Sequence, residues 1–276
     1  DFRKLLLHLI ETDHINRTEG GGLIVGITGE RVVNSYKFYA VFMENVEYSV
    51  RSESQELGTI VKPPAIGGKV AIAGRVWVVE EVDHKKRAIY VSLIKGNIPA
   101  YFGDVPGDIH THVLEKMKEI LCTNATYIYL MNNAEVRLAQ ARACFDMAKL
   151  KDRVLIHLGG NMWALFPWLG SYAFLALERF LKIHCAKELG LKGLSPVRPY
   201  FIQFGMNVSE KEFYKIVCKK ACEYIDPLSL VYEKEVPVFE KYDEFVPDEL
   251  VKKGFAYGVL DIDGMKKRVR EWEKFL

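Results

Sequence analysis

Hydrophobic residues change their spacing along this chain of 276 residues and divide it into three stretches. At the start, Leu5, Leu6, Leu9 and Ile10 give one apolar face, which predicts a helix over residues 1–15. The following stretch, GGGLIVGITGERVV, predicts a glycine turn, a short strand and then one helical turn. The chain is therefore expected to begin with a helix that leads into a glycine-rich β-ribbon.

The second stretch, residues 36–95, contains short runs of β-branched and aromatic residues separated by turn residues. The four residues from Asp83 to Lys86 fit a hairpin connection between the last two runs. Five short strands at this spacing predict a small barrel or a strongly curled sheet. The predicted strands are YKFYAVF, EYSVRS, ELGTIV, KVAIAGRVWVVEEV and RAIYVSLI.

The remaining chain mixes helical and strand patterns. Asp108 is expected to cap a helix through Leu121, and a second helix is expected from Asn132 or Asn133 to about Lys149. The segment PWLGSYAFLALERFLKIHCAKELG predicts a long helix with a proline near its start and a glycine at its end. DRVLIHL and RPYFIQFGMN predict strands.

The last part of the chain predicts three further helices. Ser209 and Glu212 have the spacing of a capping box, and VPDELVKKGFAYGVLDIDGMKKRVREWEKF predicts two helices. The whole pattern predicts an α+β fold, with a small β-rich barrel-like N-terminal part followed by a mixed α/β part with several helices. The predicted domains are residues 1–35, 36–105 and 106–276.

Composition adds little, but the distribution of charge is uneven. A net charge of +2 neither indicates nor excludes a nucleic-acid partner. Residues 149–198 carry eight basic against three acidic residues, and residues 223–249 carry nine acidic against two basic residues. Such a pair of segments predicts a polar interface or an intramolecular match, and ordinary solvated surface is the alternative.

The five cysteines are scattered and form no CxxC pair, which indicates reduced thiols in a cytoplasmic protein. Cys218 and Cys222 share a helix face without nearby histidines, so we expect buried apolar residues there and not metal ligands.

Two segments bear on targeting and membrane insertion: the N-terminus and the longest uncharged run. The N-terminus has no initiator Met and begins within a helical pattern, which is typical of a fragment cut from a longer protein. The longest uncharged run, from Val154 to Leu177, contains a Gly159-Gly160-Asn161 turn and Pro167. We therefore expect a strand, a turn and a buried helix there, and no membrane span.

Motifs for covalent chemistry are missing from the sequence. PAIGGKVAIAG lacks the first glycine of a phosphate-binding loop, and GGGLIVGITG lacks the preceding strand of a dinucleotide site. Asp108, His110 and His112 are spaced two apart on a predicted helix, where they face different directions, so no metal site is expected. No Ser or Cys nucleophile has a recognisable base motif. We therefore predict no catalytic residue and no cofactor in this chain.

Aromatic residues beside basic residues remain as candidates for nucleic-acid binding. Arg75 and Trp77 project from the same strand face, and NIPAYFGD places Tyr101 and Phe102 in a loop just after Lys95. Single-strand binding uses such pairs, because the rings stack on bases and the cations meet phosphates. Trp77 is expected to anchor the β-domain from within, which makes Tyr101 the better candidate for a base-stacking platform.

Four segments, in order, resemble one protein family. They are GERVVNSYKFYAVF (29–42), GGKVAIAGRVWVVEEVD (67–83), GNIPAYFGD (96–104) and EKYDEFVPDELVKKGFAYGVLDIDG (240–264). Together they are similar to the C-terminal region of Lhr-like superfamily 2 helicases of the DEAD/DEAH type. The first resembles the junction where the family's winged helix passes into its next domain. Two departures stand out: Val78 replaces an arginine of the family, and Ala100-Tyr101 replaces a Phe-Trp pair.

The resemblance implies a role in DNA repair. Such helicases have two RecA-like motor domains, a winged helix and a β-rich accessory domain. They hydrolyse ATP with Mg²⁺ and move 3′ to 5′ on single-stranded DNA, and they unwind duplexes and RNA:DNA hybrids. This chain would then be the end of the winged helix (1–35) plus the accessory domain. Its expected partners are single-stranded DNA or an RNA:DNA hybrid and its own motor domains, with no membrane and no small-molecule substrate.

Two functions follow as hypotheses from these observations. The first is a non-catalytic, strand-guiding nucleic-acid-binding region of an ATP-dependent helicase. The second is a scaffold that packs on the motor or recruits a protein and touches no nucleic acid. An independent enzyme has little support from the residues.

Overall fold

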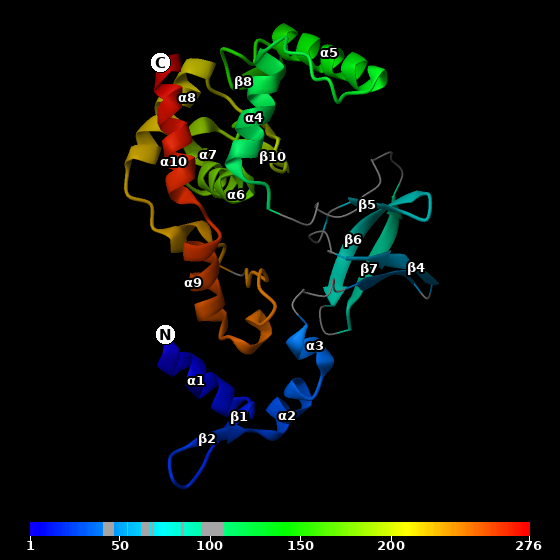
Figure 1. Ribbon diagram of the computed structural model, residues 1–276, viewed down its shortest axis with the longest axis vertical. Helices are drawn as coiled ribbons and strands as arrows, with labels where there is room; N and C mark the ends of the chain where they lie inside the picture. Colours follow the sequence, from blue (N-terminus) through cyan, green and yellow to red (C-terminus); the bar gives the residue numbers. More distant parts are fainter. Residues whose placement is uncertain are drawn as a thin grey trace. The chain divides into compact units, whose positions relative to one another are not determined.

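The protein forms two compact units, of which one contains residues 1–31 and 108–276 and the other residues 32–107. Residues 1–31 thus belong to the same unit as the C-terminal part of the chain. Helices and strands are interspersed along the chain (Figure 1), and the fold class is α+β, as predicted. The computed structural model describes residues 1–40, 47–53, 55–61, 67, 69–83, 86–94, 108–233 and 235–276.

The unit of residues 32–107 is built on one five-stranded sheet with the order β4-β3-β7-β6-β5. Neighbouring strands are antiparallel, except for β3 and β7, which are parallel. The pairing of β6 with β7 confirms the predicted hairpin. The strands are β3 (Tyr48–Ser52), β4 (Gln55–Ile60), β5 (Lys69–Ile72), β6 (Arg75–Asp83) and β7 (Ala88–Ile94).

The sheet curls so strongly that its two edge strands approach one another. A Cβ atom added at Gly58 on β4 would lie 3.1 Å from Cδ1 of Ile72 on β5, and Gly58 has φ +148°. A glycine allows this close approach because it has no side chain. The concave face encloses a small core, which confirms the predicted barrel-like curl. Its buried residues are Val50, Val70, Trp77, Val79, Ile89 and Val91.

Two of the predicted strands are different in the structure. The described part of YKFYAVF is a helical turn, α3 (Tyr36–Tyr39), because the Ser35 hydroxyl accepts a hydrogen bond from the Lys37 N–H and caps it. KVAIAGRVWVVEEV is two strands and not one, because Ala73 (φ +51°) and Gly74 (φ +72°) make a tight turn. The sheet therefore has five strands, as predicted, but they are not the same five segments.

The N-terminal residues form a helix followed by a β-ribbon, as predicted. Their elements are α1 (Phe2–Glu11), β1 (Ile15–Arg17), β2 (Leu23–Val25) and α2 (Ile27–Val33), with β1 and β2 antiparallel. Ion pairs of Asp1 with Lys253 (2.5 Å) and of Lys4 with Glu249 (2.6 Å) join α1 to α9 (Asp248–Gly258).

The second sheet has four antiparallel strands in the order β10-β11-β9-β8. Strands β8 (Leu155–Gly159) and β11 (Phe201–Gly205) were predicted, whereas β9 (Met162–Leu165) and β10 (Lys192–Val197) were not. Strand β9 lies within the run Val154–Leu177, after the predicted strand and turn, where a buried helix was expected. Strand β10 contains a glycine, a proline and a register shift, which a sheet tolerates at its edge.

Helices surround this sheet and bury its inner face. α6 (Ser171–Phe180), α8 (Glu210–Cys222) and α10 (Ile262–Arg270) pack on one another. The capping box of α8 is confirmed in part, because Ser209 Oγ accepts from Glu212 N at 3.2 Å. The further elements are α4 (Thr111–Cys122), α5 (Asn132–Met147), η1 (Leu181–Cys185), α7 (Ala186–Leu189), η2 (Pro227–Leu230), η3 (Asp243–Phe245) and η4 (Glu271–Phe275).

Other helix ends differ from the prediction. The side chain that caps α4 is His110 and not Asp108, and no side chain caps α5. The long helix begins at Ser171, after the proline, and passes through a π-helical turn, η1, before Gly190 (φ +61°) ends it. Among the described residues, no helix is long and apolar enough to cross a membrane.

Replacing Trp77 by alanine tests the importance of the curled core. Trp77 is 6% exposed, and its indole N–H donates to the carbonyl of Ile72 at 3.0 Å. We expect Trp77→Ala to lower the free energy of unfolding of the sheet unit by about 3–5 kcal/mol. Urea unfolding followed by circular dichroism measures this loss.

Leu93 provides the control for that experiment. It is the register partner of Trp77 on β7, yet it is 55% exposed. Leu93→Ala should therefore change stability by less than about 1 kcal/mol. Equal losses in the two variants would contradict the assignment of Trp77 to the core.

Candidate functional site

The predicted nucleic-acid-binding residues are described only in part. Arg75 and Trp77 lie on β6, whereas Lys95, Tyr101 and Phe102 fall outside the described residues. The aromatic loop that the sequence proposes as a stacking platform therefore stays a prediction.

Arg75 and Trp77 have different surroundings, although they lie two residues apart on the same face of β6. Trp77 is buried in the core, which confirms that it anchors the sheet from within, and its ring offers no stacking surface to a base. Arg75 opens β6 next to the turn and is exposed. Within the part of the chain that the structure describes, its guanidinium has no hydrogen bond or ion pair. Register places Arg75 and the exposed Leu93 at the same end of the sheet.

Asp108 and His110 of the GDIHTH segment are engaged in hydrogen bonds. Nδ1 of His110 accepts from the N–H of His112 and caps α4, so it is occupied. Asp108 accepts a hydrogen bond from the Tyr172 hydroxyl at 2.5 Å, which raises the pKa of Tyr172 to about 12. Over the described ranges, no three His, Cys, Asp or Glu side chains gather as metal ligands would.

Two of the five cysteines, Cys185 and Cys218, are buried as apolar residues. Burial raises the pKa of Cys185 to about 12 and that of Cys218 to about 11, so both thiols stay protonated. The expectation that Cys222 is also buried is wrong, because this residue is exposed near the end of α8. Its helix turns Cys218 toward α10 and leaves Cys222 on the solvent side.

A histidine and a serine that the sequence analysis missed lie close together on η1 and η2. Nε2 of His184 is 3.2 Å from Oγ of Ser229, and burial together with the charge of Lys220 lowers the pKa of His184. The serine hydroxyl, however, donates to the carbonyl of Asp226 at 2.6 Å. A hydroxyl has one proton, so His184 is not placed to remove it, and the pair is not an activated nucleophile.

A hollow of about 440 Å³ lies at the N-terminus of α8. Basic and acidic side chains face each other across it, so it has no single sign of charge that would select a ligand. Its lining residues are Asp152, Arg153, Ser209, Glu210, Lys211, Tyr214 and Phe275.

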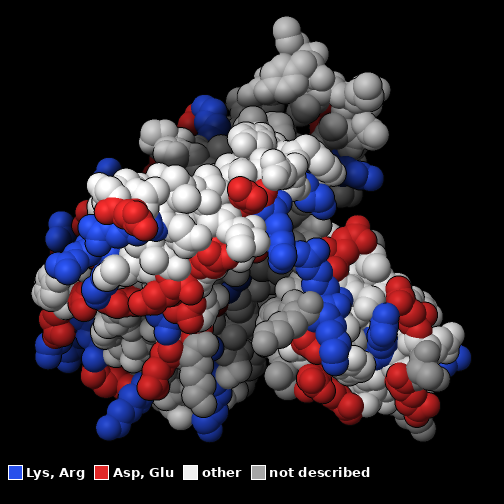
Figure 2. All heavy atoms as spheres, turned by 90° about the horizontal axis from the view of Figure 1, so that it is seen from below, with Lys and Arg blue, Asp and Glu red and all other residues white. Residues whose placement is uncertain are grey.

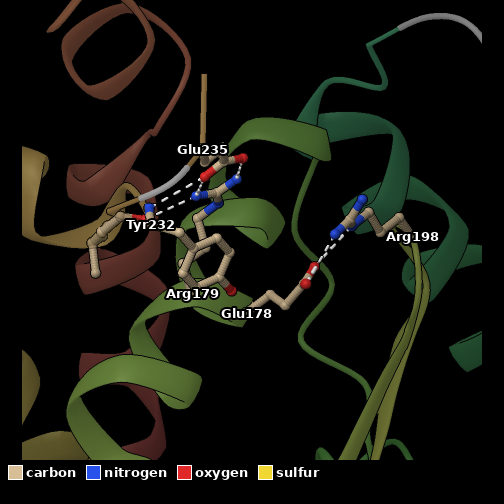
Figure 3. A network of polar contacts seen from close by, with 6 residues as sticks. Glu178, Arg179, Arg198, Tyr232 and Glu235 are labelled. Atoms are coloured by element: carbon tan, nitrogen blue, oxygen red, sulfur yellow. Dashed lines mark hydrogen bonds and ion pairs between the residues drawn. The ribbon is translucent and has the colours of Figure 1, made fainter. Parts of the chain in front are cut away.

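The basic and acidic segments of the sequence meet in a buried network (Figure 3). Arg179 on α6, from the basic segment, forms two hydrogen bonds to Glu235, from the acidic segment, at 2.6 and 2.7 Å. Its guanidinium also donates to the carbonyl of Leu230 at 2.9 Å. The predicted intramolecular match of charge is therefore present at this pair. The opposite charges of the two segments are visible in the sequence, but no pattern there identifies Arg179 and Glu235 as the pair.

Aromatic rings complete the surroundings of Arg179. The guanidinium carbon lies 4.7 Å from the ring centroid of Tyr232 and 4.9 Å from that of Phe255 on α9. A planar cation stacks favourably on such faces once water is excluded. Arg179 thereby fastens the segment that contains η2 and Glu235, and also α9, to α6.

Glu178, the neighbouring residue on α6, makes a second paired contact. Arg198 donates to both of its carboxylate oxygens, at 2.8 and 2.9 Å (Figure 3). This pair joins α6 to the residue after β10. Two adjacent charges on α6 are therefore buried and both are paired with opposite charges, which is consistent with a structural role.

Surface charge is mixed elsewhere. On the face shown in Figure 2, blue basic and red acidic side chains are interspersed. Many described basic residues are held in ion pairs, including Lys4, Arg51, Lys86, Lys116, Lys220, Lys253 and Arg268.

Comparisons with models of protein families, with curated proteins and with solved structures found no match to this chain.

Replacing Arg179 by methionine should leave the carboxylate of Glu235 without its partner. We expect Arg179→Met to lower the free energy of unfolding by about 3 kcal/mol, measured in urea at neutral pH. Lys182→Met is the matched control, because Lys182 also lies over the Tyr232 ring (4.9 Å) but is exposed. Its loss should be below about 1 kcal/mol. A smaller loss in Arg179→Met than in the control would contradict the anchoring role.

The same pair should respond to acid. Burial favours the neutral acid of Glu235, but the hydrogen bonds and charge of Arg179, the Tyr232 N–H and Lys252 outweigh it and lower its pKa below the ordinary 4.5. A lowered acid pKa stabilises the fold above the ordinary value, and this stabilisation is lost as the pH falls through the folded-state pKa. The stability advantage of the wild type over Glu235→Gln should therefore be constant near neutral pH and shrink below pH 4.5. Thermal unfolding of both proteins across acidic pH measures this stability difference. A difference that does not change with pH would contradict the role of the Glu235 carboxylate.

Proposed function

We propose that this chain is a non-catalytic, strand-guiding nucleic-acid-binding region of an ATP-dependent 3′-5′ helicase of the Lhr-like DEAD/DEAH type. The ATP and Mg²⁺ site belongs to RecA-like motor domains that are distinct from this chain. Its nucleic-acid partner is single-stranded DNA or an RNA:DNA hybrid, in DNA repair in the cytoplasm.

One structural observation carries this proposal. The boundary between the two compact units falls between Arg31 and Val32. This position lies inside GERVVNSYKFYAVF, the segment that resembles the family's junction between its winged helix and the following domain. The unit boundary thus coincides with the segment that carries this part of the resemblance, which supports the proposal.

Two further features are compatible with the proposal. The segment GGKVAIAGRVWVVEEVD contains the β5–β6 hairpin with its buried Trp77, and α1 with the β1–β2 ribbon has the helix-and-ribbon form of the end of a winged helix. The exposed Arg75 at the end of the sheet supplies a cation for a phosphate. Single-strand binding of this kind depends on phosphate contacts with stacking in addition.

A second candidate function is a protein-interaction scaffold. Helix α5 has one buried residue, Phe145, and large apolar side chains near it are exposed to solvent. Such a surface favours contact with protein and not with a phosphate backbone. The exposed apolar residues are Ile128, Tyr129, Met131, Val136 and Met147.

Fluorescence anisotropy with a labelled single strand of about 20 nucleotides tests the proposed function. We expect salt-sensitive binding that weakens about tenfold in Tyr101→Ala through lost stacking, and a few-fold in Arg75→Ala through one lost phosphate contact. The slope of log affinity against log salt should become smaller by roughly 0.7 in Arg75→Ala.

Arg87→Ala is the control for the loss of one charge. Arg87 is exposed in the same unit, but it precedes β7 and so lies at the opposite end of the β6–β7 pair from Arg75. The Arg87→Ala variant should leave the affinity for the single strand and the salt dependence of that affinity unchanged. Absence of binding at low salt would contradict nucleic-acid binding by this chain and favour the scaffold.

A further inference from the structure

Helix α8 has a row of lysines along one face. Lys211, Lys215 and Lys219 are four residues apart, so neighbouring side chains lie above one another with a rise of about 6 Å. All three are exposed, and within the described part of the chain none of them has a hydrogen bond or an ion pair. The two acidic residues of the helix lie in its first turn, so from Phe213 onwards α8 has only basic charges.

A second row of cations lies on the neighbouring segment of α10 and η4. This segment runs antiparallel to α8, because the Tyr214 ring lies 4.9 Å from the Phe275 ring, while the ammonium of Lys266 donates to the backbone at the end of α8. The exposed cations of the segment are three and four residues apart, and they are Lys267, Arg270 and Lys274.

Both rows border the line of contact between the two helices. The thiol of Cys218 donates to the carbonyl of Val269 on α10 at 3.5 Å. Lys215 lies three residues before Cys218 and is therefore its neighbour on the surface of α8. Arg270 lies four residues after Lys266, which reaches α8, and so lies on the same side of α10. The two rows together form one strip of exposed cations, the α8–α10 surface.

The elements that form the α8–α10 surface have an excess of positive charge. Together α8, α10 and η4 contain nine basic and five acidic residues. The whole chain has a net charge of only +2. The excess on these three elements is therefore larger than that of the complete chain, which makes this strip attractive to an anionic polymer.

The residue types favour a phosphate backbone as the partner. A membrane-binding helix needs large apolar side chains beside its cations, and protein interfaces are depleted in lysine and depend on aromatic anchors. Of the large apolar side chains that are exposed in the described part of the chain, none lies on α8, α10 or η4. Cations without such anchors are typical of contacts to nucleic-acid phosphates, which do not depend on base sequence.

We propose that the α8–α10 surface binds the phosphate backbone of a nucleic-acid single strand and is a second contact surface, in the larger unit, in addition to Arg75 in the smaller unit. The identity of the partner rests on the proposed function, whereas the position of the surface follows from its charges. The lysine and arginine side chains replace counterions of the strand and make no contact with bases. The surface therefore holds a strand whatever its sequence.

Fluorescence anisotropy with a labelled oligo-dT strand of about 20 nucleotides tests this surface in the double variant Lys215→Gln/Lys219→Gln. We expect the affinity to fall about tenfold, because two phosphate contacts are lost, and the slope of log affinity against log salt to become smaller by roughly 1.4, at about 0.7 for each contact. An oligo-dA strand should show the same fold loss, because no base is contacted.

Lys187→Gln/Lys192→Gln is the matched control, because it removes the same charge from exposed lysines on α7 and β10. Helix α7 contacts α8 from another side, where Lys220 pairs with Glu188 at 2.7 Å. Lys220 is five residues after Lys215 and so points away from it. The control should leave the affinity and its salt dependence unchanged. Equal melting temperatures by circular dichroism verify that both variants are folded.

The outcomes distinguish the α8–α10 surface from the proposed function. Equal losses in the two double variants would indicate an effect of net charge alone and overturn the surface. An unchanged affinity in Lys215→Gln/Lys219→Gln, together with a loss in Arg75→Ala, would overturn the surface and leave the proposed function intact. A loss in the double variant without any loss in Arg75→Ala or Tyr101→Ala would support the surface and contradict the proposed site in the smaller unit. Absence of binding by the wild type at low salt would overturn both.

Discussion

The buried guanidinium of Arg179 constrains the larger unit more than any other single group. A cation cannot lie in a protein interior unless its charge and most of its N–H groups find partners. Here the partners come from η2, from Glu235 and from the aromatic rings of Tyr232 and Phe255. Placing Arg179 on α6 therefore fixes the course of the chain from η2 to α9. The Nε–H group of Arg179 is buried and has no hydrogen-bond partner among the described residues, so one donor of the guanidinium is left unsatisfied.

This constraint extends to the N-terminus. Helix α1 has no buried residue and is joined to α9 through Asp1 and Lys4. Exposed ion pairs of this kind contribute only about 0–1 kcal/mol each. The position of α1 thus depends on α9, and α9 depends in turn on the packing of Phe255 against Arg179. In the smaller unit, the described residues of the sheet are held by the apolar core around Trp77.

The sequence predicted features that depend on neighbours along the chain and missed those that depend on distant residues. The cap of α8, the hairpin of β6 with β7 and the burial of Trp77 follow from short patterns. Strand β10 was missed because Gly193 and Pro196 argue against a strand, and only its place at the sheet edge permits them. The opposed charges of two segments were visible, but the choice of Arg179 and Glu235 is made by tertiary packing.

The candidate nucleic-acid site depends on Arg75, a cation with no carboxylate partner among the described residues, and net charge does not reveal it. Several of the basic residues named above are neutralised by a neighbour, so those that are not have the greater effect on binding of anions. Arg75 is exposed at the end of a sheet, where a long phosphate backbone can reach it. Sequence pattern identified Arg75 because it lies two residues before Trp77, on the same face of one strand.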